Sequence, residues 1–123
     1  MPEQDHLESF IGNSFRSVWA LEVLQFLVER PTASFSSEEL ISALRVSSAV
    51  ISQSVGNLLA AGLVMVDGDG RISLHAVKED DLALVRAAID FYQRSPDKVR
   101  RLIVAQAAPG ITAFADAFKL RRD

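Results

Sequence analysis

The side chains in this chain with the clearest capacity for recognition are two carboxamides, Gln53 and Asn57. They stand four residues apart, so in a helix they lie one turn apart on the same face. A carboxamide donates and accepts hydrogen bonds together, and either side chain can therefore make a paired contact to the edge of an adenine. The chemistry offered by this spacing is hydrogen-bonded recognition of a partner that presents both donors and acceptors.

Positive charge is scarce around this pair. No Lys or Arg occurs between Arg45 and Arg71, and the formal net charge of the chain is -3. Residues 1–97 hold 14 acidic and seven basic side chains, whereas residues 98–123 hold two and six. A polyanion is therefore repelled by the body of the chain and attracted by its tail, over a range of roughly 10 Å at physiological salt.

Catalytic and metal-binding chemistry has no comparable pattern. The chain lacks cysteine, which excludes disulfides, thiolate metal sites and a cysteine nucleophile. Its two histidines, His6 and His75, form no pair and no arrangement with Ser and Asp that indicates a nucleophile. The run Asp67-Gly68-Asp69-Gly70 resembles the middle of a calcium loop, but Met65 and Ala76 occupy its first and last ligand positions. We therefore expect neither an enzyme nor a bound metal or cofactor.

The first element expected is a long helix. Residues 1–8 are polar and predict a disordered segment, and apolar residues then cover nearly the whole circumference of a helix from Phe10 to Glu29. Arg30-Pro31 ends this helix, because the residue before proline is forced out of the helical region. Such a helix must be covered on most sides, either by its own domain or by a second copy of the chain. The apolar space around Trp19 is also compatible with a small-molecule site.

Two short helices joined by a tight turn follow. Ser36 and Glu39 have the spacing of a capping box, so a helix is expected from there to about Arg45. The pair Ser47-Ser48 caps the next helix, which ends at Gly62 with the following leucine packed beneath it. The buried stripe predicted for this second helix is Ile51, Val55, Leu58 and Leu59.

A hairpin and further helices complete the chain. The runs Val64–Val66 and Arg71–Leu74 flank Asp67–Gly70, whose residues tolerate a positive φ, so they predict a hairpin. Glu79–Asp81 place negative charge at a helix start, where it suits the helix dipole, and this explains the cluster better than a cation site does. The next helix has the stripe Leu82, Val85, Ile89 and Tyr92 and ends at Ser95-Pro96, and two more helices are expected over Asp97–Ala107 and Thr112–Arg122.

The run from Ser47 to Val64 resembles the recognition helix and exit of bacterial winged-helix transcription regulators of the MarR and PadR kind. Its marks are Ser52, the leucines at 58 and 63, and the exit Gly62-Leu63-Val64, and the resemblance covers about residues 15–75. It implies a mostly α fold with a small β-hairpin wing, that is, a winged helix-turn-helix followed by C-terminal helices. It also implies that the second helix enters the major groove of DNA while the hairpin lies beside the phosphates. The DNA-facing residues are then Ser48, Ser52, Gln53 and Asn57, with Arg71 from the wing.

The C-terminal segment carries a second candidate surface. An apolar stripe at helical spacing is followed there by basic residues, and this combination suits docking in a groove or on an acidic surface. The stripe is Ile111, Phe114, Ala115 and Phe118, and the partner-binding residues expected are Phe114, Phe118, Lys119, Arg121 and Arg122. Alternatively this helix packs on its own domain, or its basic end flanks DNA and contacts phosphates.

The expected organisation is one domain with appendages. Residues 1–8 form the disordered segment, residues 9–77 the winged helix-turn-helix domain, and residues 78–123 a helical extension for dimerisation or docking. The longest apolar run, Val18–Val28, contains Glu22 and is too short and too polar to span a membrane, and the acidic start argues against a secretory signal. We therefore expect a cytoplasmic protein.

Two functions remain open from the sequence. The first is a homodimeric transcription regulator that binds double-stranded DNA through a recognition helix at about Ser48–Ala61 and a wing at about Val64–His75. The alternative is a winged-helix module that binds another protein through the neutral helix face or the basic C-terminal helix.

Overall fold

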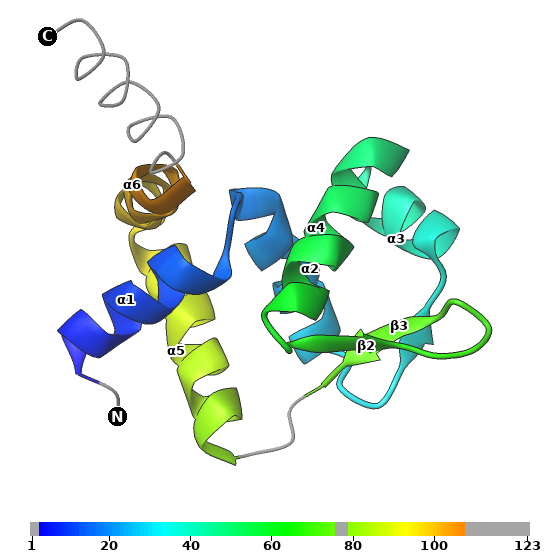
Figure 1. Cartoon of the computed structure of the whole chain (residues 1–123), viewed down its shortest axis with the longest axis horizontal. Helices are drawn as coiled ribbons and strands as arrows, with labels where there is room; N and C mark the ends of the chain where they lie inside the picture. Colours follow the sequence, from blue (N-terminus) through cyan, green and yellow to red (C-terminus); the bar gives the residue numbers. More distant parts are fainter. Residues whose placement is uncertain (1–2, 76–78, 108–123) are drawn as a thin grey trace, which may run out of the picture.

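The computed structural model describes residues 3–75 and 79–107 of the chain, and this part is mostly helical with a small three-stranded antiparallel sheet (Figure 1). The helices are α1 (Gln4–Ser14), α2 (Val18–Val28), α3 (Ser37–Leu44), α4 (Ser48–Ala60), α5 (Glu79–Arg94) and α6 (Pro96–Ala107). The strands are β1 (Ser34–Phe35), β2 (Val64–Val66) and β3 (Ile72–Leu74). The helix predicted over Thr112–Arg122 lies outside the described residues.

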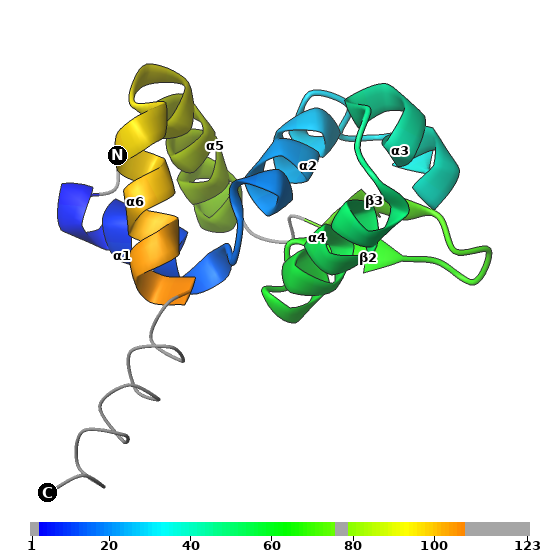
Figure 2. The same ribbon diagram turned by 90° about the horizontal axis from the view of Figure 1, so that it is seen from above.

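The elements form two groups around a common core. In Figure 2, α1, α5 and α6 lie together on one side, while α2, α3, α4 and the sheet lie on the other. The groups meet where α2 packs against α5, and there the Tyr92 hydroxyl donates a 2.7 Å hydrogen bond to Glu22 Oε2. Both groups contribute to one cluster of buried side chains, which includes Ile11, Phe15, Leu24, Leu27, Leu40, Leu58, Val85, Phe91, Val99 and Ile103.

The start of the chain differs from the sequence expectation. Residues 4–8, predicted to be disordered, belong to α1, because Leu7 and Ile11 are buried one turn apart and α1 packs against α6. The single helix predicted from Phe10 to Glu29 is also wrong, since extended backbone at Phe15 ends α1. The Ser17 hydroxyl then accepts a hydrogen bond from Ala20 N and starts α2. The α1 helix packs against α6 and α5.

The long apolar helix finds most of its cover within the chain. Five residues of α2 are buried by other elements of the same chain, namely Ala20, Leu21, Val23, Leu24 and Leu27. Trp19, around which the sequence is compatible with a small-molecule site, is 44% exposed. One copy of the chain is therefore enough to bury the main faces of α2.

The two short helices follow the predicted pattern. The capping box at the start of α3 is confirmed, since Ser36 Oγ accepts from Glu39 N at 3.1 Å while Glu39 Oε1 accepts from Ser36 N at 2.8 Å. This helix ends at Arg45, which adopts a left-handed conformation with φ +56°. Ser47 Oγ caps α4 by accepting from Val50 N.

The buried face of α4 is narrower than predicted. Ile51, Val55 and Leu58 are buried as expected, but Leu59 is 44% exposed. Each residue of a helix lies about 100° around the axis from the one before it, so Leu59 does not share the direction of the buried Leu58, which lies on the face toward α2. Gly62 closes the helix with φ +74°, the conformation in which glycine is favoured.

The sheet orders its strands β1-β3-β2, all antiparallel, so the predicted hairpin of β2 and β3 is confirmed and gains β1 as a third strand. Ser34 pairs with Ser73, and Val66 pairs with Ile72. The connecting turn is held by Gly70 N donating to Asp67 O, with Gly70 at φ +80°. The short strands therefore form a small platform beside α4.

Candidate nucleic-acid interface on α4

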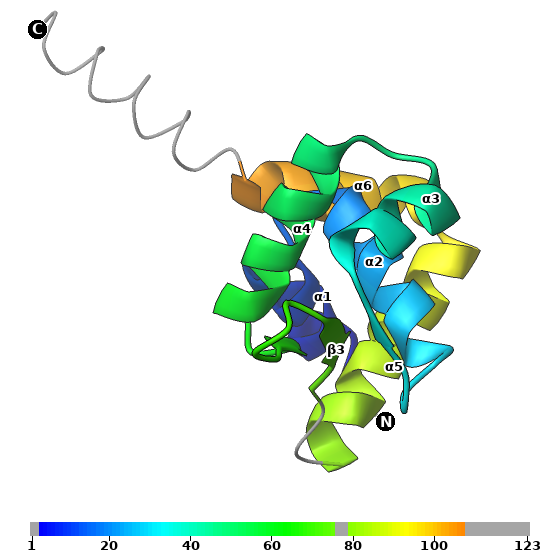
Figure 3. The ribbon, with the colours of Figure 1, turned by 90° about the vertical axis from the view of Figure 1, so that its right-hand side faces the viewer.

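One face of α4 is turned outward along its whole length. Ser48, Ser52 and Gln53 are exposed, as are Gly56 and Ala60 further along the helix. The opposite face packs on α2 and α3, and Figure 3 shows that α4 lies at the outside of this group of elements. Three of the four residues predicted on this helix therefore have side chains that a partner can reach.

Asn57, the fourth of these residues, is engaged within the chain. Its Oδ1 accepts a 2.8 Å hydrogen bond from Arg16 N, and its Nδ2 donates a 2.7 Å hydrogen bond to Ser14 O. One oxygen and one nitrogen of the amide are thus used together, and these are the atoms needed for a paired contact to adenine. Asn57 thus holds the connection between α1 and α2, and its predicted contact to a base stays a prediction.

A surface hollow lies between α4 and the connection held by Asn57. It has a volume of about 440 Å³ and is lined by Arg16, Ser17, Gln53, Gly56, Asn57 and Ala60. Arg16 is exposed and is the cation among these lining residues. The hollow is therefore lined by one positively charged residue and by the exposed residue Gln53.

Gly56 lies within this hollow without a packing reason in the described chain. Apart from its chain neighbours and the backbone of its own helix, a Cβ built at Gly56 would meet no heavy atom of the described residues within 4 Å. Glycine in the middle of a helix costs about 1 kcal/mol relative to alanine. The fold itself thus gains nothing visible from this glycine, whereas a partner that approaches the helix backbone closely would.

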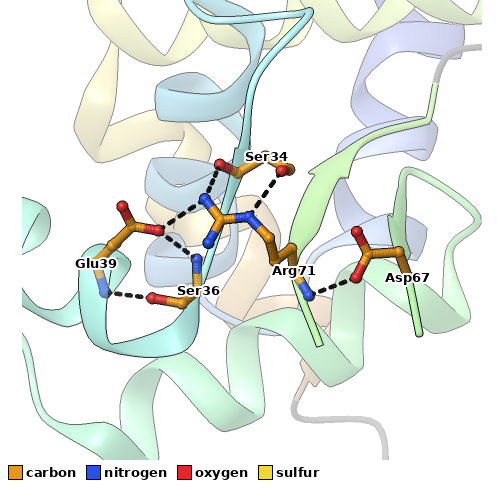
Figure 4. A network of polar contacts seen from close by, with 5 residues as sticks. All are labelled: Ser34, Ser36, Glu39, Asp67 and Arg71. Carbon is orange, nitrogen blue, oxygen red and sulfur yellow. Dashed lines mark hydrogen bonds and ion pairs between the residues drawn. The ribbon is translucent and has the colours of Figure 1, made fainter. Parts of the chain in front are cut away.

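Arg71, predicted to contact phosphates from the wing, is turned back onto its own domain (Figure 4). Its Nε donates to Ser34 Oγ at 3.0 Å, and its Nη2 donates to Ser34 O at 2.8 Å and to Glu39 Oε1 at 3.0 Å. The last contact is an ion pair, so the positive charge of Arg71 is compensated by Glu39. The guanidinium of Arg71 is thus engaged with β1 and α3, and its predicted phosphate contact stays a prediction.

Two carboxylates, those of Glu39 and Asp67, accept hydrogen bonds from Arg71. The pKa of Glu39 lies below its usual value of 4.5, mainly because its carboxylate accepts the hydrogen bond from Ser36 N and further because Arg71 is close. Asp67 Oδ1 accepts hydrogen bonds from Asp69 N and Arg71 N, which fixes a carboxylate at the base of the turn. The hairpin therefore offers carboxylates, and its single arginine is neutralised.

Two other arginines close to α4 have no carboxylate partner in the described chain. The ion pairs among residues 3–75 and 79–107 involve Arg30, Arg71, Arg94, Lys98 and Arg100. Arg16 and Arg45 are not among them, and both are exposed. Sequence reasoning missed Arg16 because it placed this residue inside a long helix. The signal that identifies it is Ser17, a preferred helix-capping residue directly after Arg16.

Three further points concern the C-terminal tail, membrane spans and metal binding. The residues expected to bind a partner through the tail, Phe114, Phe118, Lys119, Arg121 and Arg122, lie outside the described residues. Within the described ranges, no helix is both long and apolar enough to cross a membrane. In the same ranges, no three His, Cys, Asp or Glu side chains are grouped as a metal ion would require.

No protein-family model matches this chain, and neither the curated proteins nor the solved structures that were compared with it gave a match.

Proposed function

We propose that this chain is a winged helix-turn-helix protein that binds double-stranded DNA and regulates transcription. The observation that carries the proposal is the order and pairing of the elements from α2 to β3. A helix, a short strand, two helices joined by a tight turn, and a hairpin whose second strand pairs with the first strand follow one another. In proteins built in this way, the second helix of the turn enters the major groove. In this chain that helix is α4.

The exposed side of α4 supports this function chemically. Ser48, Ser52 and Gln53 supply donors and acceptors that can read base edges, and Gln53 can make a paired contact to adenine. Gly56 leaves room for a close approach of DNA to the helix backbone. The proposed base-reading set is therefore Ser48, Ser52 and Gln53, without Asn57.

Arg45 supports the same face from the turn before α4. The left-handed conformation that ends α3 is usually occupied by glycine, whereas here an arginine adopts it with φ +56°. Its side chain is exposed, and only Val46 and Ser47 separate it from the first residue of α4. An arginine at a position where glycine is easier to accommodate fits a role in contacting an anionic partner.

Selection from a pool of randomised duplexes, followed by fluorescence anisotropy on the enriched sequence, tests the proposal. We expect the wild-type protein to enrich a motif and Gln53→Ala to lose discrimination at one base pair by about 1–3 kcal/mol. Gln93→Ala is the matched control, because Gln93 is an exposed glutamine on α5. An absence of enrichment, together with no anisotropy change at low salt, would contradict DNA binding.

A second candidate function is binding of another protein. It is favoured by exposed apolar side chains at the end of α4 and on the edge strand β2, where Leu59, Met65 and Val66 are each more than 40% exposed. Apolar surface of this kind suits a protein partner better than a phosphate backbone. In this case Met65→Lys should abolish capture of the partner, while Gln53→Ala should not change it.

We further propose that the DNA-binding form is a homodimer in the cytoplasm. Two copies present two α4 helices, which matches the paired half-sites that helix-turn-helix dimers bind. Sedimentation with and without an enriched duplex tests this, with two copies expected on each duplex and a single copy contradicting the dimer.

A further inference from the structure

We infer that Arg16 is the residue that anchors the α4 face to the DNA backbone, and that Asn57 acts by holding Arg16 in place. This inference rests on the proposed DNA-binding function and names a phosphate contact that the sequence analysis did not identify. The residue proposed to bind phosphate is therefore Arg16, between α1 and α2, and not Arg71 beside the hairpin.

The geometry begins with the two hydrogen bonds of Asn57. Ser14 and Arg16 lie either side of Phe15, whose side chain is buried in the core. Asn57 accepts from Arg16 N and donates to Ser14 O, so a residue of α4 fixes the backbone on both sides of Phe15. The position of Arg16 relative to the exposed face of α4 is therefore set by a side chain of α4 itself.

Charge complementarity identifies the phosphate backbone as the occupant of the hollow. Arg16 and Gln53 line it together, and no carboxylate side chain is among the lining residues. The guanidinium of Arg16 takes part in no ion pair within the described chain, in contrast to Arg71. A guanidinium that is not neutralised can bind a phosphate through two parallel hydrogen bonds, while the neighbouring carboxamide reaches a base edge.

The size of the hollow and the glycine within it fit the same occupant. Gly56 and Ala60 give the floor of the hollow no long side chain, and a Cβ at Gly56 would still have open space around it. A sugar-phosphate strand can therefore approach the helix between Arg16 and Gln53 without displacing protein atoms.

The salt dependence of binding to a short fluorescent duplex of random sequence tests the inference. Each phosphate contact contributes about 0.9 to the slope of log K against log salt concentration. We expect Arg16→Ala to reduce the slope by about that amount between roughly 50 and 200 mM NaCl, and Arg16→Lys to restore it. The substitution should leave the fold intact, because the hydrogen bond of Arg16 described above is made by its backbone N–H. Arg86→Ala is the matched control, since Arg86 is an exposed arginine on α5 that forms no ion pair among the described residues.

Asn57→Ala separates positioning from direct base contact. If Asn57 positions Arg16, the variant loses the same part of the salt slope as Arg16→Ala, and combining the two substitutions removes no more. A residue that contacted a base would instead change sequence preference and leave the slope unchanged. That second result would overturn the positioning role.

The outcomes distinguish the inference from the function on which it rests. A wild-type slope for Arg16→Ala, together with altered sequence preference for Gln53→Ala, would overturn the role of Arg16 and leave DNA binding intact. If neither the wild-type protein nor the variants bind duplex DNA at low salt, both the inference and the proposed function fail.

Discussion

Two arginines, Arg71 beside the hairpin and Arg16 between α1 and α2, differ in which of their atoms the chain engages. On the wing, Arg71 donates to Ser34 and forms an ion pair with Glu39. Beside the α1–α2 connection, Arg16 lines a hollow and is held through its backbone N–H, which leaves its guanidinium available. The position of a charged residue in the sequence therefore does not reveal whether a partner can contact its charge.

The difference follows from which part of each residue is engaged. Arg71 has its guanidinium committed, so its charge contributes to joining β1, β3 and α3. For Arg16 the backbone is anchored instead. A folded protein can therefore engage one arginine through its side chain and another through its backbone, which leaves the second side chain exposed.

The largest effect on stability is expected for Asn57→Ala, because Asn57 holds the backbone of Arg16. Asn57→Ala deletes two hydrogen bonds and leaves Ser14 O and Arg16 N without that partner, which should lower the free energy of unfolding by about 1–3 kcal/mol. Urea denaturation measures this loss. Arg71→Ala should cost less, because its two hydrogen bonds to Ser34 and its ion pair with Glu39 are made by a side chain that is 39% exposed. The reverse ranking of the two variants would contradict the assignment of Asn57 as the stronger structural link.

A second variant should leave the guanidinium of Arg71 without an ion pair, as that of Arg16 is among the described residues. Glu39→Gln removes the carboxylate that neutralises Arg71 yet keeps an oxygen that can accept from Ser36 N, as a glutamine does in a capping box. With its charge released, Arg71 should raise the salt slope of DNA binding by up to about 0.9 and tighten binding at low salt. Glu38→Gln is the control, because Glu38 is an exposed neighbour on α3 without an ion pair among the described residues. Equal gains in both variants would indicate only a general charge effect.

A third variant tests whether Gly56 lowers the stability of the protein while leaving space for DNA beside α4. Gly56→Ala should raise the free energy of unfolding by about 0.4–1 kcal/mol, because alanine favours the helix and the added Cβ meets no described atom. The same variant should bind duplex DNA more weakly than the wild-type protein, since its methyl group enters the hollow. Thermal unfolding and fluorescence anisotropy on the same preparation measure both. Increased stability with unchanged DNA affinity would show that no partner approaches the helix at this point.

The smallest effect concerns the titration of Glu39. Its folded-state pKa is lowered, so its contribution to stability is present above the usual value of 4.5 and is lost as the pH falls through the folded-state pKa. Carboxyl-detected NMR on Arg71→Ala should show the pKa of Glu39 rising toward its usual value while remaining below it, because the hydrogen bond from Ser36 N persists. No change in this pKa would mean that Arg71 is not paired with Glu39 in solution.

Local signals in the sequence predicted most elements of the group formed by α2, α3, α4 and the sheet. The Ser36–Glu39 capping box and the glycine at the end of α4 depend on residues a few positions apart. The hairpin depends on the turn residues Asp67–Gly70 in the same way. Such features can be read from spacing alone, because the partner of each group is close in the chain.

The features that the sequence did not predict depend on distant partners. Asn57 bonds to residues more than 40 positions away, and Arg71 to residues more than 30 positions away. A helix pattern shows which face a side chain occupies, but not what stands opposite it. For α1, the polar start concealed Leu7, whose burial depends on the packing of α1 against α6.

The most direct test of the central account is to follow backbone amide signals of the labelled protein by ¹⁵N–¹H NMR while duplex DNA is added at low salt. The account predicts that the largest shifts occur at Arg16 and along Ser48–Gly56, while the signals of Asp67–Arg71 change little. Shifts concentrated on Asp67–Arg71, or no shifts along α4, would contradict it.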